Sequence, residues 1–284
     1  MSAIYKSQAA QEAVEAGYRK LLDTWPIPKE ELRIPTSQGE TFVIACGPKD
    51  APALIALHGA QANAVTWMFD SLVWSQTFRT FLIDVPGDAG FSAPVRPPLG
   101  GEAYVNWLDE VTAALGFRQV SLVGISLGGW LALDYATRRS ERVTSIALLC
   151  PAGVGGQKNL LLKALPLLLL GPWGQRKLFE MVFGEAPEDP PPVARELMAF
   201  MTLVTTSTRA RPLKIPVFSD EALARLTMPV LAIVGGKDVL LDSDGTRRRL
   251  QAHAPGAEVR YLPEGRHFLP GQTQAIDEFL RRAT

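Results

Sequence analysis

The sequence predicts an α/β fold in which a mainly parallel sheet carries helices on both faces. Short runs of consecutive apolar residues, typical of strands buried on both faces, alternate along the chain with segments of helical periodicity. The 284 residues are enough for one large domain with a substantial core. The alternation is interrupted once, at residues 157–225, which indicates an insertion.

Outside this interruption, the spacing of apolar residues assigns each element. Spacings of three and four residues indicate helices, and alternating or continuous apolar runs indicate strands. The expected elements are a helix at 7–22, strands at 32–34, 41–45, 53–57 and 78–84, a helix at 104–115, a strand at 120–123 followed by a helix, strands at 143–149 and 230–234, a helix at 242–254, a strand at 258–262 and a helix at 274–282.

The interruption is rich in Leu, Met and Phe and shows no strand alternation. A structureless loop of roughly 70 residues is implausible inside a compact domain, so we expect a helical cap. The chain would then comprise an α/β-core, residues 1–156 and 226–284, and a cap, residues 157–225. A cap over a site forms the roof of its pocket, so part of its apolar surface should face substrate while most packs on the core. Its large apolar residues are Leu160 to Leu170, Trp173, Phe179, Met181, Phe183, Met198, Phe200 and Met201.

Charge and cysteine usage exclude several classes of protein. The formal net charge is zero, and no basic run exceeds Arg247–Arg249, so a nucleic-acid partner is not expected. Cys46 and Cys150 stand at the ends of apolar runs and have no metal-ligand spacing. We expect both to be buried free thiols rather than parts of a metal site or a disulfide framework.

Membrane insertion is not expected either. Residues 1–16 contain no apolar signal core. The most lipid-like segment covers only residues 160–170 and is interrupted by Lys163 and Pro166, whereas a membrane-spanning helix needs about 20 residues. We predict a cytoplasmic protein without a membrane span, with a homodimer left open.

The segment 119–135 places a serine between a buried strand and a helix. Strand, Gly-x-Ser-x-Gly and helix form the pattern of a nucleophile elbow. Gly124 and Gly128 flank Ser126 where the backbones come too close for a β-carbon. The turn would present the Ser126 hydroxyl at the carboxyl end of the sheet, beside a helix N-terminus with unpaired N–H groups. We therefore predict Ser126 as a nucleophile.

A serine nucleophile needs a base to take its proton, and the chain has three histidines. His253 lies in the expected last turn of a polar helix, where a histidine is usually solvated or caps carbonyls. His58 precedes Gly59 at the end of a strand and is expected only to order its loop. His267 lies in a loop leaving the last strand, where an α/β-sheet keeps its reactive groups. His267 is the predicted base.

The base in turn needs a carboxylate to orient it. Asp238 directly follows a strand, so it should lie at the same sheet edge as Ser126. Asp242 stands at an expected helix start and is better explained as an N-cap. Asp84 also ends a strand but precedes the serine in the chain, whereas the order nucleophile, acid, base favours Asp238.

The oxyanion of a tetrahedral intermediate needs two N–H donors. Leu127, directly after the nucleophile, should supply one. The loop after the strand ending at Leu57 should supply the other, and its small residues favour Ala60, with Gln61 as the alternative. Trp67, further along this loop, could either pack in the core or face substrate.

Together these segments resemble the α/β-hydrolase superfamily. The resemblance rests on Leu57-His58-Gly59, Asp84-Val-Pro-Gly87 with Gly90 and Ser92, Gly124 to Gly129, Asp238, and Gly265-Arg-His267. It covers the chain apart from the cap and points to the branch of capped carboxylesterases, haloperoxidase-like proteins and carbon–carbon hydrolases. The chain departs from the hormone-sensitive-lipase-type branch, which has His-Gly-Gly-Gly where this chain has His58-Gly-Ala-Gln61. It also departs from the dehalogenases, which have aspartate as nucleophile.

The resemblance implies a hydrolase that uses no cofactor and no metal. We predict a carboxylesterase-like serine hydrolase (EC 3.1.1) that cleaves a medium-sized, largely apolar carboxylic ester through an acyl-enzyme. A carbon–carbon bond hydrolase and a cofactor-free perhydrolase share the same motifs and stay open as alternatives. A catalytically idle small-molecule binding protein of this fold is the alternative from another class.

Overall fold

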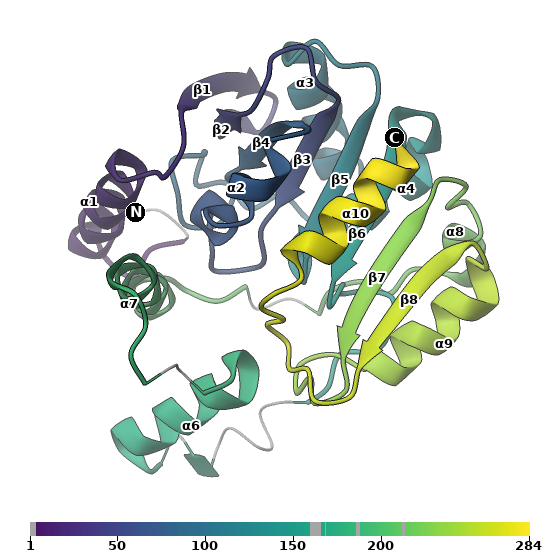
Figure 1. Ribbon diagram of the computed structural model, residues 1–284. Helices are drawn as coiled ribbons and strands as arrows, with labels where there is room; N and C mark the ends of the chain where they lie inside the picture. The colour runs from purple at the N-terminus through teal and green to yellow at the C-terminus, as the bar shows by residue number, and fades with distance from the viewer. Residues whose placement is uncertain (1–3, 160–165, 168, 186–187, 212–213) are drawn as a thin grey trace.

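The computed structural model describes residues 4–159, 166–167, 169–185, 188–211 and 214–284. One twisted sheet forms the middle layer of this structure, and helices cover both of its faces (Figure 1). This architecture confirms the predicted fold class.

The sheet has eight strands in the order β1-β2-β4-β3-β5-β6-β7-β8. The pairs β1–β2 and β2–β4 are antiparallel, and all other pairs are parallel. The strands are β1 (Lys29–Thr36), β2 (Gly39–Cys46), β3 (Ala53–Leu57), β4 (Arg79–Ile83), β5 (Val120–Ile125), β6 (Val143–Leu149), β7 (Val230–Gly235) and β8 (Ala257–Leu262). The chain order reverses between β3 and β5, and the carboxyl ends of strands at such a switch point are where α/β-sheets bind ligands.

Two buried clusters, one on each face of the sheet, form the core. Alternation along β2 divides its side chains between them, with Val43 and Ala45 in one cluster and Phe42, Ile44 and Cys46 in the other. The first cluster is covered by α3 (Ala103–Ala114), α4 (Leu127–Arg138), α8 (Asp220–Leu223) and α9 (Ser243–His253). The second is covered by α1 (Gln8–Asp23), α2 (Ser71–Trp74), α7 (Pro192–Ser207) and α10 (Thr273–Ala283).

Every strand and helix expected in the core is present, with ends that differ by a few residues. α1 begins directly after Ser7, whose hydroxyl accepts the Ala10 N–H. Three short helices were not expected: α2, η1 (Ala64–Trp67) and η2 (Ser140–Arg142). Trp67, in η1, is 2% exposed and packs against Trp74 with ring centroids 5.5 Å apart, so its main role is in packing.

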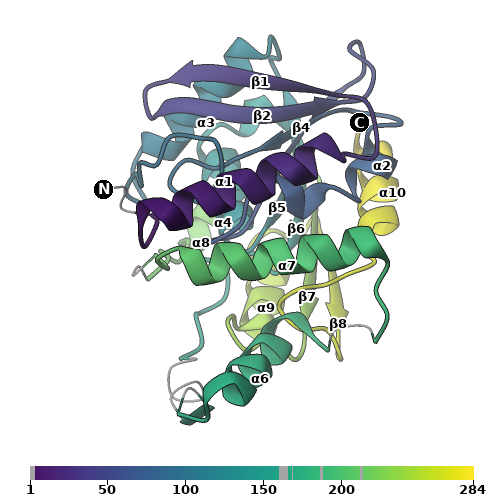
Figure 2. The same cartoon turned by 90° about the vertical axis from the view of Figure 1, so that its left-hand side faces the viewer.

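Between β6 and β7 the described residues form three helices, α6 (Gly171–Phe183), α7 and α8. α6 lies apart from the sheet, whereas α7 runs alongside α1 (Figures 1 and 2). Phe200 of α7 contacts Tyr18 of α1 with ring centroids 5.9 Å apart. α8 packs on α9, and its Leu223 is fully buried in the core, so the last turn of the expected cap is part of the core packing.

Most of the apolar run at 160–170 lies outside the described residues. Among the helices that the structure describes, none is long and apolar enough to cross a membrane.

Candidate active site

Ser126 lies between the last residue of β5 and the first residue of α4, at φ 53° and ψ −112°. A positive φ is costly for a residue with a β-carbon. The turn is held by backbone hydrogen bonds, because the Ser126 N–H donates to Leu149 O at 3.0 Å and the Ser126 carbonyl accepts the N–H of Ala152 at 3.1 Å. The strained turn is the geometry that the elbow pattern predicts.

The two glycines of the motif occupy positions of close backbone approach. A β-carbon on Gly128 would lie 2.0 Å from Leu57 O, and one on Gly124 would lie 2.4 Å from Gly128 O. Both clashes involve backbone atoms, which cannot move aside as a side chain can. Close packing between β3, β5 and α4 is therefore the physical reason for both glycines.

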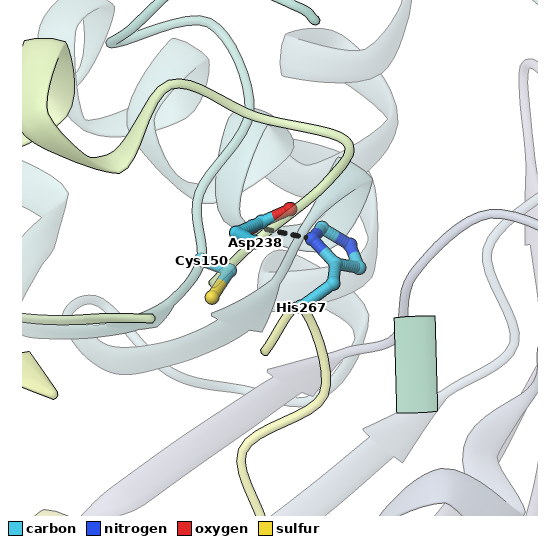
Figure 3. A group of neighbouring side chains, drawn as sticks. All are labelled: Cys150, Asp238 and His267. Atoms are coloured by element: carbon cyan, nitrogen blue, oxygen red, sulfur yellow. Dashed lines mark hydrogen bonds and ion pairs between the residues drawn. The ribbon is translucent and has the colours of Figure 1, made fainter. Parts of the chain in front are cut away.

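His267 and Asp238 lie together at the carboxyl edge of the sheet (Figure 3). His267 Nδ1 lies 2.8 Å from Asp238 Oδ2, and both side chains are buried. Asp238 Oδ1 accepts the backbone N–H groups of Leu240 at 2.7 Å and Leu241 at 3.0 Å. Burial alone would raise the pKa of Asp238, but the His267 contact and these two N–H groups together lower it. Asp238 is thus held as a carboxylate that orients His267.

Cys150, the residue after β6, lies beside this pair. Its Sγ and ligand atoms of Asp238 and His267 all lie within 4.8 Å of one another (Figure 3). Burial, followed by the charge of Asp238, raises the pKa of the Cys150 thiol, and a protonated thiol is a poor metal ligand. Since Asp238 and His267 also bind each other, these three groups fit a proton-transfer site better than a metal site.

Three residues that the sequence analysis rejected as catalytic acid or base have other roles in the structure. Asp242 caps α9 by accepting the Gly245 N–H at 3.0 Å. Asp84 is fully buried and accepts the N–H groups of Ala64 at 2.9 Å and Phe91 at 2.8 Å, so it joins two loops. His253 lies at the end of α9, 3.4 Å from Asp220 Oδ2.

His58 orders the loop after β3, which is the role expected for it. Its Nε2 accepts the Val85 N–H at 2.9 Å, and its Nδ1 lies 2.8 Å from Gly59 O. Burial lowers the pKa of His58 to about 4, although the Gly59 carbonyl opposes this shift. The imidazole is therefore neutral and engaged at both nitrogens, which leaves neither free to act as a base.

Ala60 and Leu127, the predicted sources of the oxyanion donors, line a common cavity with Ser126 and His267. Leu127 is the first residue of α4, and the first N–H groups of a helix have no carbonyl partner within it. The Ala60 N–H has no hydrogen-bond partner among the described residues, whereas the Gln61 N–H donates to Asp88 Oδ1 at 3.0 Å. This contact removes Gln61 from consideration and favours Ala60.

The cavity measures about 760 Å³. It is lined by Ala60, Gln61, Leu99, Ser126, Leu127, Gln157, Lys158, Asn159, Ala210, Arg211, Lys214, Ile215, Leu240, Leu241 and His267. Among the described residues, Ser126 Oγ and His267 form no hydrogen bond, and such contacts commonly tighten only when substrate binds. Cys46 and Cys150 are buried free cysteines, as predicted. Sequence reasoning placed neither Asp88 nor Arg211 at this site, and it did not place Cys150 beside His267, although its position directly after a strand could have indicated this.

Comparisons with known proteins agree with this geometry. The model of the alpha/beta hydrolase family matches residues 54–282. The chain is 28% identical over 266 residues to carboxylesterase YbfK of Bacillus subtilis, with 90% of each chain covered. The crystal structure of naproxen esterase (carboxylesterase NP) from Bacillus subtilis matches with a TM-score of 0.82 and 28% identity, covering 98% of this chain and 99% of that one. The chain belongs to the alpha/beta hydrolase family.

Proposed function

We propose that this protein is a serine esterase that cleaves carboxylic esters through an acyl-enzyme. The observation that carries the proposal is the strained Ser126 turn, which shares one cavity with the buried His267–Asp238 pair. A serine, a base and a buried carboxylate that orients the base are the parts that activate a hydroxyl for acyl transfer.

In the proposed reaction, His267 takes the Ser126 proton as Oγ attacks the ester carbonyl. The N–H groups of Ala60 and Leu127 stabilise the oxyanion of the tetrahedral intermediate. His267 then gives its proton to the departing alcohol, and the acyl group stays on Ser126. A water molecule, deprotonated by His267, releases the acid and restores the serine. Throughout, Asp238 stabilises the charged imidazole.

The relatives support ester chemistry. YbfK and naproxen esterase are both described as carboxylesterases, and each aligns with nearly the whole of this chain. A cavity of about 760 Å³ suits a medium-sized substrate, and its leucine and isoleucine side chains suit an apolar portion. The structural neighbours also include a meta-cleavage product hydrolase and a 2-hydroxy-6-oxo-6-phenylhexa-2,4-dienoate hydrolase, which are 20 and 21% identical and establish only a shared fold. The helical cap, the cytoplasmic location and the homodimer stay predictions.

The first test is labelling with a fluorescent organophosphonate, with the modified residue located by mass spectrometry. We expect the adduct on Ser126, and no adduct in Ser126→Ala or in His267→Ala. His253→Ala is the matched control, because it removes a histidine at the half-exposed end of α9, and it should label as the parent protein does.

Absence of labelling in a folded parent protein would contradict the esterase proposal and favour the binding-protein alternative. Labelling combined with turnover of a vinylogous diketone, but not of simple esters, would favour the carbon–carbon hydrolase.

A further inference from the structure

The charge of the catalytic cavity was not expected from the sequence. Three cationic side chains line it, those of Lys158, Arg211 and Lys214, and no acidic side chain is among the described residues that line it. The amide side chains of Gln61, Gln157 and Asn159 also line it. A neutral, wholly apolar ester would offer these cations no negative charge, which is unfavourable for the buried Arg211.

Arg211 provides the strongest evidence that the cavity binds an anionic group. Its side chain is only 6% exposed, and its Nε and Nη1 are buried without a hydrogen-bond partner. Its Nη2 binds the Tyr104 hydroxyl and Pro86 O. The nearest carboxylate is Asp88, whose Oδ2 lies 3.8 Å from Arg211 Nε. That distance allows charge compensation but exceeds that of a hydrogen bond.

A buried N–H of a charged group that lacks an acceptor is unfavourable, so such groups normally meet a protein or ligand acceptor. Asp88 Oδ2 is also without a hydrogen-bond partner and lies beside Nε, so it compensates part of the Arg211 charge, whereas Nη1 has no acceptor among the described residues. Because Arg211 also lines the cavity that contains Ser126, a bound molecule can supply an acceptor for Nη1.

The two lysines add to the positive charge of the same cavity. Lys214 is exposed and has no hydrogen-bond or ion-pair partner among the described residues. Lys158 Nζ donates to the backbone carbonyl of Asp238 at 2.7 Å, which leaves its charge without a counterion. Neither cation is therefore neutralised by an acidic partner.

We propose that the substrate is an ester that also bears a carboxylate, and that Arg211 and Lys214 bind this carboxylate at a distance from the scissile bond. The inference rests on the proposed esterase function and specifies its substrate class. A guanidinium and an ammonium form short, charge-assisted hydrogen bonds to carboxylates. The apolar lining would then contact the hydrocarbon between the two ends.

Binding tests the inference without relying on turnover. In the Ser126→Ala protein, affinities would be measured calorimetrically for monoethyl adipate and ethyl hexanoate, which differ in having a carboxylate or a methyl at the far end of the acyl chain. A second pair, 3-carboxypropyl butyrate and butyl butyrate, places the carboxylate on the alcohol. We expect at least one carboxylate ester to bind about tenfold more tightly than its neutral partner, as one charge-assisted contact would give.

Substitutions then assign the preference to the cations. Lys214→Met and Arg211→Gln, each combined with Ser126→Ala, should weaken binding of the preferred carboxylate ester severalfold and leave its neutral partner unchanged. Lys49→Met is the matched control, since Lys49 is an exposed lysine paired with Glu30, outside the cavity lining. If Arg211→Gln does not fold, the binding data for Lys214→Met alone test whether the cations cause the preference. High salt should reduce the preference, because it screens the exposed Lys214.

The outcomes separate the two proposals. Equal binding within both ester pairs overturns the carboxylate inference, whatever the activity of the parent protein. A carboxylate preference in Ser126→Ala, with no labelling and no hydrolysis by the parent, supports the anion site and contradicts the esterase function. The same preference in kcat/KM of the parent protein supports both.

Discussion

The carboxyl edge of the sheet and the segment between β6 and β7 are built in different ways. At the sheet edge, Ser126 directly follows β5 and Asp238 lies shortly after β7, and all residues of both strands are buried. In the other segment, α6 lies apart from the sheet, and α7 has only Phe200, Val204 and Ser207 buried. Close packing therefore determines where the proposed catalytic residues lie, whereas a more loosely attached segment supplies Arg211 and Lys214 to the cavity.

This difference suggests a division of roles. The core positions the proposed nucleophile, base and acid with little freedom, because glycines near them are in close backbone contact. Among the described residues of 157–217, few side chains are buried, so they can change at a low cost in stability. Reaction chemistry would then belong to the core, and substrate choice to the residues that follow α7.

The largest expected effect concerns the acid. Asp238→Asn should lower kcat by roughly four orders of magnitude, because an amide cannot hold the required His267 tautomer or stabilise its charge. Asp242→Asn is the matched control, since asparagine also accepts the N-cap hydrogen bond, and it should retain full activity. Steady-state ester hydrolysis measures both. Equal losses in the two variants would contradict the assignment of Asp238.

A stability comparison within residues 157–225 comes next. Leu223→Ala should lower the free energy of unfolding by about 2–5 kcal/mol, since Leu223 is fully buried in the core. Trp173→Ala should change it by less than about 0.5 kcal/mol, because Trp173 of α6 is 53% exposed. Urea unfolding measures both. A large loss for Trp173→Ala would show that α6 is as firmly packed as the core.

The smallest expected effect is a pH dependence at Asp88. Burial, opposed by the charge of Arg211, raises the pKa of Asp88 to about 6, against about 3.9 in an unfolded chain. Between these values the folded state binds the proton more tightly, so stability should fall as the pH rises from about 4 to about 6, by on the order of 2 kcal/mol.

Urea unfolding across this pH range would compare the parent protein with Asp88→Asn. Asp88→Asn should lack the contribution of Asp88 to the pH dependence of stability. The difference in the free energy of unfolding between the two proteins should therefore change with pH. Parallel pH profiles would mean that Asp88 has an ordinary pKa and that Arg211 is fully compensated in the folded state.

Much of the fold could be predicted because the core elements have strong local patterns. Continuous apolar runs marked β3 and β5, and helical spacing marked α1 and α10. The short helix α2 was missed because four residues carry too little periodicity to detect. α8 was assigned to the insertion by its position in the chain, although its burial against α9 makes it part of the core packing.

The sequence by itself determined the order of the elements, the Ser126 turn and the elimination that led to His267 and Asp238. These follow from local patterns and from the rule that parallel strands end at one edge of a sheet. Only the tertiary structure decided that the Gln61 N–H is taken by Asp88, that Cys150 lies beside the acid and base, and that Arg211 has buried donors without acceptors. These facts depend on contacts between segments far apart in the chain, and local residue preferences do not specify such contacts.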